Sequence, residues 1–248
     1  MLGAPFTSDR RGPRQHGDAE VVEVATEPPA DIAPEAPWGA PVGRVATVSF
    51  AVGTLALVAY GMHRLPVAAW PFVLPNAVYE GLAAAFALFQ TRGHAHASTP
   101  AEVVLPVVST WLYPIASLVL GGHAVRHAPL AAYAALLVAF ATYAWLIWAV
   151  LCLRRNFSIL PEVRTLVTGG PYARLRHPLY LGYSVLWLVA AWQSGSLPLG
   201  ALAVFSVLLF DRRAAMEERR LRAHVPAYAS YMTQTWRLIP GTGRLAQA

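Results

Sequence analysis

The segment from Thr168 to Tyr183 holds most of the side chains with which this chain could do chemistry. Arg174, Arg176 and His177 lie within it, and strongly apolar stretches flank it on both sides. Arginine holds a carboxylate or a phosphate through charged hydrogen bonds, and histidine gains or loses a proton near neutral pH. The segment therefore predicts a binding site for a charged small molecule at the mouth of an apolar helix.

Pro178 and the nearby tyrosines extend this prediction. Proline is favoured as the first residue of a helix, where free backbone N–H groups bind an anion such as a carboxylate. Tyr172, Tyr180 and Tyr183 can stack on a base or face a cation. The simpler alternative is that these residues only flank a membrane helix, since arginine and tyrosine are common there. A His-Pro pair is not needed for flanking, so His177 favours a site.

The flanking interpretation suits other basic residues of the chain better. Four arginines stand directly beside apolar runs without any neighbouring His-Pro element. We interpret them as markers of membrane topology. They are Arg154, Arg155, Arg212 and Arg213.

Glu217 and Glu218 follow the last apolar segment and are the expected partners of the basic turn. A carboxylate there can hold the ammonium group of a ligand. The same spacing also fits a solvated helix face, because Arg213 and Arg222 stand four residues from one glutamate each. The sequence leaves both interpretations open.

The histidines and the cysteine predict no metal site and no disulfide. His94 and His96 are close enough to share a metal, but no third ligand stands at a useful spacing. Cys152 is the only cysteine, which excludes an intrachain disulfide.

Composition indicates an integral membrane protein. Of the 248 residues, 56% are hydrophobic and 13% are charged, against about 25% charged in an ordinary soluble domain. The net charge of +6 comes from arginines that cluster beside apolar runs. We therefore expect contact with anionic lipids and no binding of nucleic acid.

Hydropathy predicts an all-α integral membrane protein with about six transmembrane helices. Four apolar spans come first, and two runs near 15 residues then form a hairpin that either crosses with tilt or dips partway. Glu80 lies in the second span, at the interface or facing the bundle interior, and we favour the interface. The predicted spans are 45–62, 69–90, 103–120, 129–153, 179–192 and 197–210.

The chain divides into three parts. Residues 1–42 are rich in proline and polar residues and are predicted to be disordered. Residues 43–153 form a four-helix transmembrane region. Residues 154–248 hold the basic turn, the hairpin, an amphipathic helix over 211–224 and an aromatic tail that we expect to fold back as a helical cap.

Charge asymmetry predicts the topology. Five arginines and a single glutamate fall between Arg154 and Arg176, which places this loop in the cytoplasm. The loops near Arg64 and Arg126 carry one arginine each and are expected outside. Both termini, and any site at the basic turn, are then cytoplasmic, and we expect the membrane to be a bacterial inner membrane.

Three motifs resemble the isoprenylcysteine carboxyl methyltransferases and their bacterial relatives. They are the run Arg155–Glu162, the run Leu166–Tyr172 and the Arg-His-Pro-Leu-Tyr-Leu-Gly element of Arg176–Gly182. Glu217-Glu218 and the tail with Tyr228, Tyr231 and Ile239-Pro240 fit the same pattern. The resemblance covers about residues 150–240.

The resemblance implies a membrane enzyme that uses S-adenosylmethionine, with a pocket between the Arg-His-Pro element and the Glu-Glu helix. It implies catalytic roles for Arg176 and Glu217. By position, the cofactor-binding residues are Tyr172, His177, Pro178, Tyr180, Gly182, Glu217 and Glu218.

The acceptor is less constrained than the cofactor. Family members that methylate prenylcysteine tend to carry a basic residue shortly after the second tail tyrosine, but Met232-Thr-Gln234 stands here. We expect methyl transfer to a lipophilic small molecule or lipidated substrate, with a carboxylate favoured. N-methylation of a phospholipid head group is one alternative, and a non-catalytic binding or transport protein of the same fold is another.

Overall fold

The structure is a computed structural model, and it describes residues 21–22, 38–64, 70–91, 93, 97, 99–120 and 128–243. Its regular secondary structure is helical apart from two strands of two residues each. Three of its helices are long and apolar enough to cross a membrane: α1 (Gly39–Arg64), α3 (Ala101–Leu120) and the segment Pro129–Asn156. The chain is thus an all-α integral membrane protein, as predicted.

The remaining helices complete a bundle of six. They are α2 (Trp70–Leu88), which is a shorter apolar helix, α5 (Pro178–Ser194) and α6 (Leu197–His224). The segment Pro129–Asn156 consists of α4 (Pro129–Leu153) and a short 3₁₀ turn. Large apolar side chains such as Val119, Leu130 and Leu197 are exposed on the outside of the bundle. Such a surface suits lipid contact better than contact with water.

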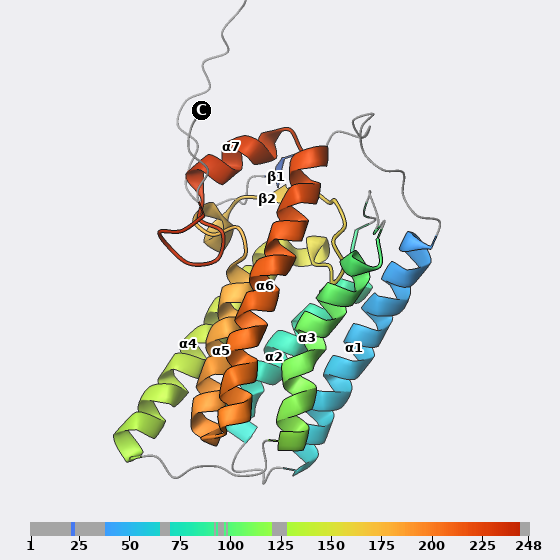
Figure 1. Cartoon of the computed structure of the whole chain (residues 1–248). Coiled ribbons are helices and arrows are strands. Elements are labelled where there is room, and N and C mark those ends of the chain that lie inside the picture. The colour runs from blue at the N-terminus through green and yellow to red at the C-terminus, as the bar shows by residue number, and fades with distance from the viewer. Residues whose placement is uncertain are drawn as a thin grey trace, which may run out of the picture.

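The six helices are arranged as a ring rather than in chain order. α1 packs on α2, α2 on α4, α4 on α5, α5 on α6 and α6 on α3, as Figure 1 allows the reader to follow. Trp111 of α3 closes the ring against Phe50 and Gly53 of α1. The inside of this ring is where the candidate site lies.

The predicted spans agree with the helices to within a few residues, except at the start of α1 and at the end of α6. The fourth span, 129–153, matches α4 at both ends, whereas α1 begins at Gly39, before the predicted residue 45. Within the tail predicted to be disordered, Val21–Val22 (β1) pairs antiparallel with Leu166–Val167 (β2). These valines suit a strand and add to the free edge of β2. The rest of 1–37 lies outside the described residues.

α6 does not stop where the sequence predicted the hairpin to close. It runs unbroken through Asp211 to His224, because no glycine or proline interrupts it after Gly200 and Arg213 pairs with Glu217 one turn later. Its 28 residues give a length of about 42 Å, longer than the ~30 Å hydrocarbon core. α6 therefore carries Glu217 and Glu218 past its apolar segment.

The tail folds back over one end of the bundle. α6 ends at His224, and after Pro226 the short helix α7 (Ala227–Gln234) begins, as predicted. In Figure 1, α7 lies across the same end of the bundle as the far half of α6. The chain then runs alongside the basic turn, where Leu175 and Trp236 form a parallel bridge.

Two glycines set the shape of the turn and of the helix that follows it. Gly170 in the 3₁₀ turn η3 (Gly170–Ala173) has a φ of +60°, and a side chain there would meet Cys152 at 2.6 Å. An added Cβ at Gly182 would lie 2.5 Å from Cδ2 of Leu146. Gly182 therefore lets α5 approach α4 closely.

Replacing Gly182 should loosen this helix pair. Gly182→Ala forces a methyl group into the fully buried Leu146, and we expect a loss of about 1–3 kcal/mol in the free energy of unfolding. Thermal unfolding of the purified protein in detergent measures it. Gly200→Ala in α6 is the matched control, since an added Cβ there meets no atom within 4 Å. Equal loss in the two variants would contradict the packing argument.

Candidate functional site

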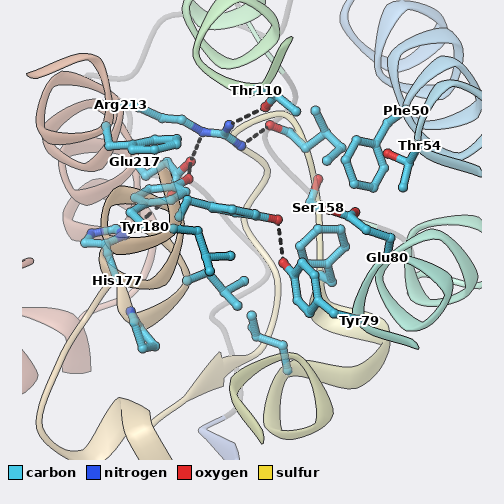
Figure 2. Close-up of a pocket in the computed structure, with 18 of the residues that line it drawn as sticks. Phe50, Thr54, Tyr79, Glu80, Thr110, Ser158, His177, Tyr180, Arg213 and Glu217 are labelled. Carbon is cyan, nitrogen blue, oxygen red and sulfur yellow. Dashed lines mark hydrogen bonds and ion pairs between the residues drawn. The ribbon is translucent and has the colours of Figure 1, made fainter. Parts of the chain in front are cut away.

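The ring of helices encloses a cavity of about 650 Å³ with two different ends. The polar end is lined by Tyr172, Arg176, His177, Tyr180 and Glu217. The other end is mainly apolar, and its lining includes Leu57, Val58, Leu118, Leu186 and Val189. Figure 2 shows part of the lining, with His177 and Glu217 on one side and Phe50 and Thr54 on the other.

Arg176 joins the basic turn to the Glu-Glu helix and to the tail. Its Nε donates to Oε1 of Glu218 at 2.6 Å, and its Nη2 donates to the carbonyl of Gly243 at 2.6 Å. Its Nη1 donates to the carbonyls of Met232 and Thr235. Every nitrogen of this buried guanidinium already has a protein partner. The geometry thus favours a positioning role over the catalytic role that the sequence suggested.

Glu218 is the buried partner of Arg176 and is 2% exposed. We call the contacts of Glu218 with Arg176 and Arg237 the Glu218 joint. Glu218 accepts from Arg176 through one oxygen and from Nε of Arg237, at 3.0 Å, through the other. Burial alone would raise the pKa of Glu218, but His177 and Arg176 outweigh it and hold that pKa at about 2. Glu218 does not line the cavity, and its contacts with Arg176 and Arg237 favour a structural role over the predicted contact with a cofactor.

Glu217 is the glutamate that faces the cavity. Its Oε1 accepts from the hydroxyl of Tyr180 and, at 3.0 Å, from Nε of Arg213. Its Oε2 lies 3.7 Å from Nδ1 of His177. The side chain is 21% exposed, against 3% for Glu218. One oxygen is therefore fixed by the protein while the other is left for a ligand.

Tyr180 orients this carboxylate and is itself held on both faces. Its ring stacks on His177 at 5.3 Å between centroids and on Phe210 at 5.2 Å. The guanidinium of Arg213 lies 5.1 Å from the ring centroid. Because both faces are covered, Tyr180 serves to position Glu217 and His177 rather than to stack on a base.

Arg213 was interpreted as a flanking arginine, and that interpretation is wrong. It is 4% exposed, and its Nη1 donates to Thr110 at 3.0 Å while its Nη2 donates to the carbonyl of Ile159. It thereby ties α6 to α3 and to the loop after α4. Its position four residues before Glu217 was the available signal. The other three flanking arginines are exposed, as expected: Arg154, Arg155 and Arg212.

Four residues that line the cavity have a buried polar atom without a hydrogen-bond partner among the described residues. The atoms are Nε2 of His177, the hydroxyls of Tyr172 and Tyr113, and Nε of Arg164. Nε2 of His177 lies 3.4 Å from Glu218 without hydrogen-bond geometry. Leaving such atoms unpaired is costly. Arg164, which sequence reasoning counted only as a mark of topology, joins the site on this evidence.

The other predicted residues divide clearly. Tyr172, His177, Pro178 and Tyr180 line the cavity with Glu217, whereas Gly182 packs against α4 and does not. The tail tyrosines Tyr228 and Tyr231 also line the cavity, and the hydroxyl of Tyr231 donates a hydrogen bond to the carbonyl of Tyr172. The basic turn and the Glu-Glu helix therefore meet at one cavity, as predicted.

No metal-ligating cluster is found in the part of the chain that the structure describes. His63 is exposed at the end of α1. The His94 and His96 pair, weighed above for metal binding, lies outside the described residues.

Comparison with known proteins gives a likeness among solved structures. No protein-family model matches the chain, and no curated protein matches it. Among solved structures, it is similar to a eukaryotic intramembrane Ras methyltransferase, isoprenylcysteine carboxyl methyltransferase. The two chains share 20% identity and a TM-score of 0.42, over 81% of this chain and 77% of the other. We rest the function on the site itself.

The Glu218 joint predicts how stability depends on pH. The pKa of Glu218 is about 2 in the folded protein, against about 4.3 in an unfolded chain. Its stabilisation is therefore complete above about pH 5 and is lost as the pH falls toward 2. Glu218→Gln should cost on the order of 3–5 kcal/mol at pH 7 and should flatten the acid side of the profile. Unfolding in detergent across this range measures both effects.

The control for this variant is Asp211→Asn, since the Asp211 side chain is 47% exposed and lies 3.4 Å from Arg237. We expect it to change stability by less than about 1 kcal/mol. A Glu218→Gln profile that runs parallel to wild type between pH 5 and 2 would rule out the joint as the cause.

Proposed function

We propose that this protein is a membrane-embedded methyltransferase that uses S-adenosylmethionine and acts on a lipophilic acceptor. The observation that carries the proposal is the pairing of a polar cavity end, with Glu217 and the unpaired atoms of His177 and Tyr172, and an apolar cavity end in the same space. A soluble, charged cofactor and an apolar acceptor need such a divided chamber. The motifs of residues 155–182 support the same conclusion.

The residues at the polar end fit the charged parts of the cofactor. Oε2 of Glu217 would hold the α-ammonium, since it accepts no hydrogen bond from the protein and lies 3.7 Å from Nδ1 of His177. Nε2 of His177, the Tyr172 hydroxyl and Nε of Arg164 have no hydrogen-bond partner among the described residues and would suit the carboxylate and the ribose hydroxyls. When bound, the cofactor supplies an electrophilic methyl carbon.

The protein's own part is alignment and exclusion of water. Tyr180 and Arg213 fix Glu217 in one orientation, and Arg176 with Glu218 fixes the turn that carries His177. Such fixed groups lower the entropic cost of bringing donor and acceptor into line. α7 supplies Tyr228 and Tyr231 to the cavity wall, and side chains there would help to keep water from the reacting groups.

A lipophilic carboxylate is the acceptor that this site needs least help to methylate. A carboxylate is already ionised near neutral pH, so no general base is required. Its apolar body would occupy the end lined by Leu57, Leu118 and Leu186. We further infer that the polar end faces the cytoplasm, because exposed arginines such as Arg155, Arg212 and Arg222 gather there.

Binding of the cofactor tests the site directly. His177→Ala and Glu217→Gln should each weaken binding of tritium-labelled S-adenosylmethionine to the purified protein by about 10- to 100-fold, since each removes a charged or buried partner. Tyr180→Phe should weaken it less, because it only frees Glu217. Asp211→Asn is the control and should bind as wild type does. Unchanged affinity in both His177→Ala and Glu217→Gln would refute the assignment.

The bond formed tests the acceptor class. Methyl label transferred to membrane lipids should be released as methanol in mild alkali, because carboxyl methyl esters hydrolyse there and N-methyl groups do not. Thin-layer analysis before and after alkali measures this. Label that stays on an amine head group would replace the ester proposal with N-methylation.

A further inference from the structure

Glu80 is a carboxylate that the proposed reaction does not use. It lies in the middle of α2, eleven residues into a helix that begins at Trp70, or about 15 Å along its axis. The sequence favoured a place at the membrane interface, and that is wrong, because Glu80 lines the cavity together with Asn76 one turn earlier. In Figure 2 it extends from α2 on the side of the cavity away from Glu217 and His177.

Glu80 has no hydrogen bond or ion pair with any residue that the structure describes. Glu80 interacts electrostatically with the phenols of Tyr79, Tyr143 and Tyr183, none of which is a cation. The hydroxyls of Tyr79 and Tyr183 are hydrogen-bonded to each other. The buried cation Arg213 is already held by Glu217. Glu80 thus lacks the partner that an acid at this depth normally has.

An acid in the membrane part of a protein is costly and indicates function. A purely apolar ligand against Glu80 would leave the carboxyl without a partner and shield it from water. A ligand that carries a hydroxyl or an amine would satisfy it. A second anionic group at this position would be repelled.

We propose that Glu80 determines acceptor specificity by binding a hydrogen-bond donor on the acceptor's apolar body, at a distance from the methylated group. The inference rests on the proposed function, which places the reacting group at the polar end. The acceptor is then a bifunctional lipid, with a carboxylate at one end and a hydroxyl or an amine farther along. A simple unbranched hydrocarbon tail is disfavoured.

The test uses C18 fatty acids of equal length. Tryptophan fluorescence of the full-length protein in detergent gives the Kd of each fatty acid. The ligands are octadecanoic acid, a series of hydroxyoctadecanoic acids with the hydroxyl moved along the chain, and the corresponding aminooctadecanoic acids. In wild type, at least one hydroxyl or amino position should bind about 10-fold more tightly than octadecanoic acid. A preference for amine over hydroxyl identifies the natural donor as a cation.

Glu80→Leu should abolish this preference without weakening octadecanoic acid, and Glu80→Gln, which keeps an acceptor oxygen, should retain part of it. Asp211→Asn is again the control and should keep all of it. The proposal is overturned if wild type shows no preference at any position, or if Glu80→Leu keeps it.

Two further measurements distinguish a failure of the Glu80 inference from misfolding and from a failure of the proposed function. Glu80→Leu should not lower the unfolding temperature, because it removes a costly acid that has no partner. It should bind S-adenosylmethionine as wild type does, because Glu80 lies away from the polar end. If wild type binds no S-adenosylmethionine but shows the hydroxyl or amine preference, the proposed function fails and Glu80 stands as a ligand-recognition residue. If it binds S-adenosylmethionine without the preference, only the Glu80 inference fails.

Discussion

The buried ion pair between Arg176 and Glu218 is the contact on which the rest of the polar end depends. It connects two segments 42 residues apart in the chain, and Arg176 extends it to three carbonyls of the tail. Breaking such a pair leaves an uncompensated charge, whereas the intact pair fixes one arrangement of its neighbours. Because His177 follows Arg176 directly in the chain, this ion pair also fixes the position of His177 on the cavity wall.

The two adjacent glutamates divide the work between them. Their side chains point in different directions because neighbouring residues of a helix lie about 100° apart around its axis. Glu218 turns into the protein and meets two arginines, whereas Glu217 turns toward the cavity and keeps one oxygen without a hydrogen bond, 3.7 Å from Nδ1 of His177. The same acidic pair thus supplies a structural anchor and a group available to a ligand, and neither could replace the other.

Sequence reasoning found the helices and the meeting of the turn with the Glu-Glu helix, because apolar length and local motifs carry that information. It could not separate Glu217 from Glu218, since both fit a solvated face equally well. It took Arg213 for a flanking charge and Gly182 for a cofactor residue. Those roles depend on which helices become neighbours, and the ring places α6 beside α3 and α5 beside α4, an order that local patterns do not contain.

The continuity of α6 has a mechanical consequence. With no break between its lipid-facing part and the turn that bears the two carboxylates, both parts must tilt as one rod. Membrane helices adjust their tilt to the thickness of the surrounding bilayer. The thickness of the host membrane is therefore a physical variable that sets the relative position of the two walls of the chamber, and lipid acyl length becomes a means of tuning it.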